Sequence, residues 1–133
     1  MIKFVFWAMI SLITIQPTVV FSQIVTGNML SDWCSGFPEK YNPRCDTYII
    51  GVIDGIAIGA IRSIATLQPN VEDDWTERYN RIIAYCFPNG ATYAQIAKVV
   101  AQYLGENPNE LHRDARALVQ VSLAEAFPCK EKP

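Results

Sequence analysis

The sequence predicts a small all-α protein, a bundle of four to five helices stapled by two disulfides. Three observations carry this prediction. Apolar residues recur at helical spacing in several segments. No segment has the period-2 alternation and hairpin turns of paired strands. Four cysteines form an even set in a short chain. We expect one helical domain over residues 23–133, preceded by a segment of a different kind.

Residues 1–22 have the pattern of a secretory signal peptide. Lys3 supplies the positive charge at its start, and residues 4–13 form a run of about ten apolar residues, which is the usual length of such a region. Pro17 interrupts the run, and Ser22 provides a small residue at a cleavage site. The segment is too short and too interrupted for an anchor. We therefore expect export, with no stable membrane insertion after cleavage.

The charged and catalytic residue types exclude several functions. Without Lys3 the chain has ten basic and thirteen acidic residues, which speaks against a nucleic-acid binder because such proteins carry a basic face. His112 is the single histidine, no Cys/His cluster has zinc spacing, and no phosphate-loop, G-x-S-x-G or H-E-x-x-H motif occurs. A carboxylate pair drawn from Asp54, Asp73 and Asp74 has no spacing that argues for acid–base work. We expect no enzyme, no cofactor and no metal site.

The four cysteines predict two disulfide bonds that hold the fold together. Four cysteines allow three pairings. We favour Cys34–Cys45, which would tie a short first helix to the start of the next one. We likewise favour Cys86–Cys129, which would tie the C-terminus to the middle of the chain. The second pair closes a loop long enough to stabilise the fold by roughly 3–4 kcal/mol in the chain-entropy model.

The central element is a helix that begins at Asn42 and Pro43, since Asn caps free amides and Pro suits the first helical position. A short helix over residues 29–35, capped by Thr26 or Asn28, precedes it. The central helix is expected to end near Thr66, because Pro69 disfavours helix at the residue before it.

Three glycines of this helix, Gly51, Gly55 and Gly59, fall at i, i+4 and i+8. Each costs roughly 1 kcal/mol relative to Ala, so we expect another backbone to approach them, either within the protomer, which we favour, or across a dimer. Isoleucines cover the other faces and predict a helix buried nearly all round. Asp54 would then be buried with a hydrogen-bond partner. A membrane span is the alternative, and the cost of Asp54 in the middle of the run disfavours it.

The second half of the chain predicts two further helical stretches. Thr92 and Gln95 form a capping box for a helix that Gly105 would end, with a buried face of Ile96, Val99, Val100, Tyr103 and Leu104. A second stretch would start at Asn107 and Pro108. Its apolar stripe comprises Leu111, Ala115, Leu118, Val119, Ser122, Leu123 and Ala126.

Residues 67–81 allow two interpretations. They form either a solvated loop or short helix with its aromatic side chain against the core, or an acidic surface centred on Trp75 that recognises a basic partner. Trp is over-represented among interface anchors, and Asp73 and Asp74 precede it directly. We therefore take Asp73, Asp74 and Trp75 as the candidate partner-binding residues.

The motifs of the second half resemble the immunity proteins of type VI secretion amidase effectors. The resemblance comprises the turn C-F-P-N-G-A-T (residues 86–92), the V-V-A-Q-Y-L helix (99–104), an N-P turn followed by His112, A-R-A-L-V (115–119) and the closing A-F-P-C (126–129). Upstream, Cys45, Tyr48 and Gly51, followed by Val52, Asp54 and Gly55, match the start of a family helix. Phe87 departs from the usual aliphatic residue, and the segment around Trp75 has no counterpart.

The resemblance implies a periplasmic, all-α, disulfide-bonded, often dimeric inhibitor. Such a protein would bind a toxic cell-wall amidase of the papain-like cysteine class and block its cleft. The alternative is a periplasmic structural or stress-protective helical protein with no toxin partner.

Overall fold

The computed structural model describes residues 24–40, 42–67 and 75–129, so the segment expected to be a signal peptide lies outside them. Among these residues there is no strand, which confirms the all-α prediction. The elements are α1 (Gly27–Cys34), α2 (Pro43–Leu67), α3 (Trp75–Ile83), α4 (Tyr93–Glu106), the 3-10 helix η1 (Pro108–Glu110) and α5 (Ala115–Ala126).

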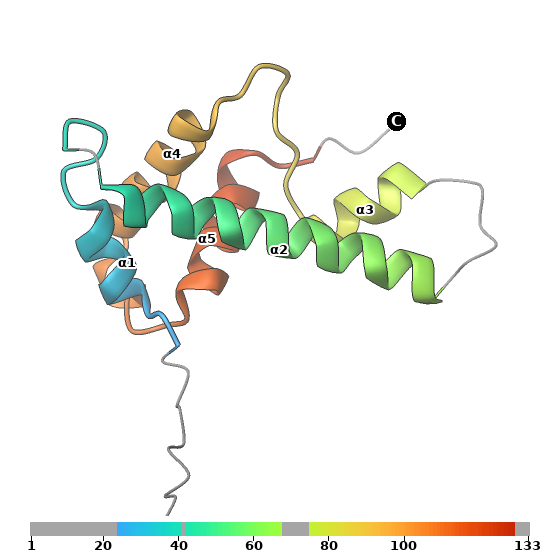
Figure 1. Ribbon diagram of the computed structural model, residues 1–133, viewed down its shortest axis with the longest axis horizontal. Helices are drawn as coiled ribbons and strands as arrows, with labels where there is room; N and C mark the ends of the chain where they lie inside the picture. The colour runs from blue at the N-terminus through green and yellow to red at the C-terminus, as the bar shows by residue number, and fades with distance from the viewer. Residues whose placement is uncertain (1–23, 41, 68–74, 130–133) are drawn as a thin grey trace, which may run out of the picture.

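Helix α2 is the longest element and organises the others. With 25 residues it extends about 37 Å at a rise of 1.5 Å per residue. In Figure 1, α1, α4 and α5 pack against its first half, and α3 lies along its second half. The second half of α2 and α3 thus form an arm, which we define as residues 55–67 together with α3.

The first two helices begin as their sequences indicate. The Thr26 hydroxyl accepts a hydrogen bond from the backbone N–H of Met29 (3.4 Å), so α1 starts at Gly27, two residues earlier than predicted. The Asn42 side-chain oxygen accepts from the N–H of Arg44 (3.0 Å). Pro43 is the first residue of α2, where its missing N–H costs no hydrogen bond.

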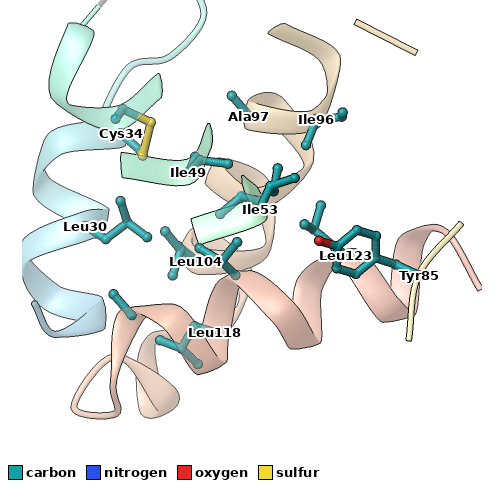
Figure 2. Packing of buried hydrophobic residues seen from close by; sticks show 14 of the residues in the cluster. Leu30, Cys34, Ile49, Ile53, Tyr85, Ile96, Ala97, Leu104, Leu118 and Leu123 are labelled. Atoms are coloured by element: carbon teal, nitrogen blue, oxygen red, sulfur yellow. A yellow bond between two sulfur atoms is a disulfide. The ribbon is translucent and has the colours of Figure 1, made fainter. Parts of the chain in front are cut away.

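The hydrophobic core lies between α1, α4, α5 and one face of α2. Figure 2 shows Leu30, Ile49, Leu104 and Leu118 pointing toward one another from these four helices. All four side chains are at most 1% exposed. Tyr85, in the connection between α3 and α4, closes the core beside Leu123. Burial of these large side chains is the main favourable term in folding.

Both disulfides join the cysteines that the sequence favours. Cys34 at the end of α1 is bonded to Cys45 in the first turn of α2, with their Cα atoms 5.0 Å apart. Cys86 is bonded to Cys129, with Cα atoms 4.9 Å apart. A backbone hydrogen bond from Cys86 N–H to the carbonyl of Phe127 (2.8 Å) supports the second link. The two bridges therefore fasten opposite ends of the bundle.

Helix α4 has the predicted capping box, since Thr92 and Gln95 each bond the other's backbone N–H. It runs one residue past Gly105 and is capped at Asn107. The helical stretch expected from Asn107 is divided, because the chain leaves η1 and restarts at Ala115 as α5. Asp114 causes the restart: its carboxylate accepts from the N–H of Arg116 (2.9 Å).

The segment before α1 also forms backbone contacts with the start of α5. Thr26 and Asp114 form an isolated antiparallel bridge, and the N–H of Ala115 donates to the carbonyl of Val25 (2.9 Å). Ala126, predicted as part of the buried stripe, is exposed because it is the last residue of α5. The remaining members of the stripe are buried or half-buried.

The expectation that α2 is buried nearly all round is wrong. Its buried residues lie on one face only, Cys45, Ile49, Ile53, Ala60 and Ile64. The other helices are shorter and cover α2 from one side. A Cβ atom placed on Gly51, Gly55 or Gly59 would meet nothing within 4 Å, so no backbone of the described chain approaches the glycine row. Asp54 is exposed as well, not buried with a structural partner.

Helix α2 is the one described helix whose length and apolar composition would suffice to cross a membrane. Only 22% of its most apolar stretch is buried inside the protein. Asp54 and Arg62 stand exposed along it, and charges in the middle of a span are costly to insert. The disulfide at Cys45 also ties it to the amphipathic helix α1. We therefore interpret α2 as a helix that uses its apolar face for protein contacts.

Candidate interface surfaces

The titratable groups of the described residues do not gather into a metal site. No group of three or more His, Cys, Asp and Glu side chains within them could hold a metal ion, and the four cysteines are all in disulfides. His112 is exposed, and its Nδ1 lies 2.9 Å from the carbonyl oxygen of Asn109, a local contact next to η1. The candidate sites are therefore exposed apolar areas that a protein partner would cover.

The arm carries most of the large hydrophobic side chains that the described chain exposes. Ile58 is 61% exposed, Ile61 44% and Leu67 77% on α2. On α3, Trp75 is 43% exposed and Ile82 42%. The arm projects from the bundle in Figure 1, so a partner could reach it without meeting α1, α4 or α5. A concentration of apolar side chains on a projecting element is typical of a protein–protein contact.

Trp75 is the first residue of α3. Its indole stacks on the ring of Tyr79, one turn further along, with centroids 5.5 Å apart and planes 14° from parallel. Tyr79 in turn packs against the core, so the indole is supported while one of its faces stays accessible. The other two predicted partner-binding residues, Asp73 and Asp74, lie outside the described residues.

The second surface is a groove of about 870 Å³ along the first half of α2. We call it the α2 groove and define it by the side chains or backbone of Trp33, Tyr48, Gly51, Val52, Gly55 and Ile56. The absence of side chains at the two glycines creates the hollow. Trp33 from α1 forms one end, its ring edge-on to that of Tyr48 with centroids 5.8 Å apart. The groove is mainly apolar, with Arg44 and Arg116 at its rim.

The rim is shaped by a local ion pair. The guanidinium of Arg116 donates to the Asp114 carboxylate, with one N–O distance of 3.0 Å, and these bonds lower the pKa of Asp114 to about 2. Burial raises the pKa of Tyr48, and the negative charge of Asp114 adds to the rise. Tyr48 therefore presents a neutral hydroxyl beside the groove at physiological pH. Arg44 and Arg116 are the charged residues that line the groove, and Arg116 is paired with Asp114.

The groove was missed from the sequence because the isoleucines of α2 suggested burial on all sides. A signal was present. At 100° per residue, Arg44, Gly51, Asp54, Ile58 and Arg62 fall on one face of the helix. Two arginines and an aspartate on that face mark it as the one turned to solvent. The glycines on the same face then define a hollow surface instead of a buried contact.

The chain is similar to one family of known proteins. Residues 26–129 match the family model described as Rap1a immunity proteins. No match was found among curated protein sequences or among solved structures. The matched segment spans α1 to Cys129, so it includes both disulfides and both exposed surfaces.

Proposed function

The chain belongs to the Rap1a family of type VI secretion immunity proteins, and from this premise we propose that it is a periplasmic inhibitor of a peptidoglycan amidase effector. Immunity proteins bind a secreted effector toxin, and those of this family are typically periplasmic. The match over residues 26–129 is the observation that carries the proposal. The amidase class, with a papain-like catalytic cysteine, comes from the resemblance of the sequence motifs.

An inhibitor of this kind acts by covering a cleft and needs no catalytic residue of its own. Enzyme clefts are reached most easily by segments that project from a rigid scaffold. The arm is such a segment, and its disulfide-linked bundle supplies the rigidity. We assign the toxin contact to the Trp75 end of the arm, where the half-exposed indole supplies apolar area. Asp73 and Asp74 belong to the same proposal, as charges that attract a basic toxin and raise the association rate.

The proposal includes a cleavable signal peptide over residues 1–22, a domain over residues 23–133, and a homodimer. A dimer would present two arms and so bind two toxin molecules. The alternative function is that of a periplasmic structural or stress-protective protein with no toxin partner. The exposed apolar side chains of the arm favour the inhibitor, because a protein without a partner gains nothing from leaving them uncovered.

The test begins with the gene next to the one for this chain. A small secreted protein with a catalytic cysteine and histidine is directed to the periplasm of a sensitive host, with and without this protein. We expect lysis without the protein and growth with it. The matched control is the toxin with its catalytic cysteine changed to alanine, which should be harmless in both cases.

A titration with purified components then distinguishes direct inhibition of the amidase from protection of the host by another route. Release of peptide stems from peptidoglycan by the amidase should fall to zero at a defined molar ratio. Survival of the host without any effect on amidase activity in vitro would favour the stress-protective alternative. Lysis at full periplasmic expression of this protein would contradict the proposal for that toxin.

A further inference from the structure

Helix α3 differs in chemistry between its two sides. At 100° per residue, Trp75, Arg78 and Ile82 fall on one side of the helix, at positions i, i+3 and i+7. Thr76 and Asn80 fall on the other side. We call the first three residues the α3 flank. Trp75 is 43% exposed and Ile82 42%, so both ends of the flank are large apolar side chains that a partner could cover.

Arg78 is the charged member of the α3 flank. Helix α3 contains three charged side chains, Glu77, Arg78 and Arg81. The guanidinium of Arg81 pairs with the Glu77 carboxylate one turn before it, at 2.6 Å. Arg78 belongs to no ion pair between residues that the structure describes, although its side chain is half-buried. The flank therefore carries an uncompensated positive charge between two apolar side chains.

The position of Arg78 decides what its charge must meet in a complex. Trp75 and Ile82 lie about 10 Å apart along the helix axis at a rise of 1.5 Å per residue, and Arg78 lies between them. A partner that covers both apolar ends also covers the guanidinium. Removing a charge from water without a counter-ion is costly, whereas arginine and a carboxylate form paired hydrogen bonds of matched geometry. A stable contact along the flank therefore requires a carboxylate opposite Arg78.

We propose that the α3 flank binds a surface of the amidase toxin that has apolar recesses for Trp75 and Ile82 and an Asp or Glu side chain for Arg78. The inference rests on the proposed function and extends it: the contact continues from Trp75 along α3, and the chemistry of the toxin surface is specified. Trp and Arg are both enriched among the side chains that dominate binding energy at interfaces. The α3 flank has one of each within a single helical turn.

A carboxylate at the contact is compatible with a toxin that is basic overall. Asp73 and Asp74 are proposed to act at long range, on the overall charge of the toxin and thus on the association rate. A desolvated ion pair acts at the contact itself, and its loss increases the dissociation rate. Arg78 therefore selects which toxin surface is bound, because a surface without a carboxylate would leave the guanidinium unpaired.

An anionic membrane is the competing occupant for a helix side that carries tryptophan, arginine and isoleucine. Electrostatic attachment to such a membrane uses clusters of about four to eight basic side chains, and the α3 flank has one. The neighbouring pair of Glu77 and Arg81 adds no net charge to the helix. These charges favour a protein partner with a single opposing carboxylate.

The test is charge reversal, measured as the dissociation constant for the amidase whose catalytic cysteine is changed to alanine. Arg78→Glu should weaken binding by about tenfold or more, because it places two carboxylates together at the contact. Arg78→Lys keeps the charge and should weaken binding less. Lys98→Glu is the matched control, since it changes the net charge of the protein by the same amount on the exposed side of α4. It should leave the dissociation constant nearly unchanged.

A second pair of variants addresses the apolar end of the flank. Ile82→Ser should weaken binding by about tenfold, as expected when a partner's recess loses its apolar side chain. Ile24→Ser, at a residue before α1 that is 62% exposed, is the control and should bind as wild type does. Melting temperatures close to that of wild type exclude a loss of fold.

The opposing carboxylate is identified from the toxin side. Surface Asp and Glu residues of the amidase are changed to lysine one at a time and titrated against Arg78→Glu. One such substitution should restore binding, because it replaces like charges by an opposite pair. If no substitution restores binding, the inference is overturned.

The outcomes distinguish this inference from the proposed function. A wild-type protein that inhibits the amidase, with Arg78→Glu and Ile82→Ser binding as tightly, refutes the α3 flank and leaves the immunity role standing. Attachment to anionic phospholipid vesicles that Arg78→Glu abolishes, with amidase affinity unchanged, also refutes the flank as a toxin contact. A wild-type protein that neither binds nor inhibits the amidase refutes the immunity role, and the inference fails with it.

Discussion

Trp75 lies against Tyr79 in a near-parallel stack, with ring centroids 5.5 Å apart. The spacing of four residues places the two rings on the same side of α3. Tyr79 contacts the core, while Trp75 stays 43% exposed. The core therefore holds an aromatic side chain in a fixed position at the start of α3. A fixed, half-exposed indole can be buried by a partner with little loss of side-chain entropy.

The first prediction concerns this indole. Trp75→Ala should weaken toxin binding by about 2 kcal/mol or more, as expected for an anchoring aromatic residue at the centre of an interface. The fold should be little affected, because the side chain is exposed on one face. Isothermal titration of the variant with the amidase measures the loss. Tyr93→Ala is the control, since Tyr93 is 58% exposed at the start of α4, away from the arm. Equal affinities of Trp75→Ala and wild type would place the contact elsewhere, with the turn at residues 87–91 as the next candidate.

The second prediction compares the two disulfides. Removal of Cys86–Cys129 by serine substitution should lower the free energy of unfolding by about 4 kcal/mol, because the bridge closes the longer loop. The sequence separation is 43 residues for this bridge and 11 for Cys34–Cys45. Removal of Cys34–Cys45, which closes the shorter loop, should lower the free energy of unfolding by about 3 kcal/mol in the same model. Urea unfolding of each double variant gives the two values. An undiminished stability without Cys86–Cys129 would contradict the loop-closure argument for this fold.

The third prediction uses two glycines with opposite surroundings. Gly105→Ala should raise the stability of the protein by about 0.5–1 kcal/mol, since Ala is the better helix former and its Cβ would meet nothing within 4 Å. Gly27→Ala should lower stability by about 1–3 kcal/mol through overpacking. A Cβ there would collide with the side chain of Leu118 and lie 2.8 Å from the carbonyl oxygen of Leu111. Thermal melts of the two variants should therefore shift in opposite directions.

The fourth prediction concerns acid. The hydrogen bonds from Arg116 lower the pKa of Asp114 to about 2, below the value near 3.9 of an unfolded Asp. The unfolded state therefore binds more protons as the pH falls from about 5 to 2, and the stability that Asp114 contributes is lost over that range. Asp114→Asn keeps a capping side chain but removes the charge.

The variant should be slightly less stable than wild type at pH 7, by less than about 1 kcal/mol because the pair is solvent-exposed. The difference should shrink steadily as the pH falls toward 2. Urea midpoints at pH 7, 4 and 2 measure it, with Asp32→Asn, an exposed residue of α1, as the control. If the stability difference between wild type and Asp114→Asn grew as the pH fell, the result would contradict a lowered pKa of Asp114.

Local sequence signals determined most of the scaffold. The capping box at Thr92 and Gln95 and the Asn42–Pro43 start fix helix ends through hydrogen bonds that are made within a few residues. The apolar stripe of α4 was correct for the same reason, because its period of 3.6 is a local property. The disulfide pairing followed from which cysteines end neighbouring elements. The helix ends and the apolar stripe depend on residues close together in the chain, whereas the Cys86–Cys129 bridge joins residues 43 positions apart.

The surfaces, by contrast, were decided by the tertiary structure. Isoleucines occur on several sides of α2, and these hydrophobic residues alone do not indicate which side the other helices cover. The shorter helices α1, α4 and α5 cover the side of Ile49 and Ile53 around its first half, and α3 packs along its second half. The glycine row, Asp54 and Ile58 were thereby left on the open side. The charged residues of α2 indicate its solvent-facing side, but how far the other helices cover each isoleucine is a property of what packs against the helix, and only the assembled bundle decides it.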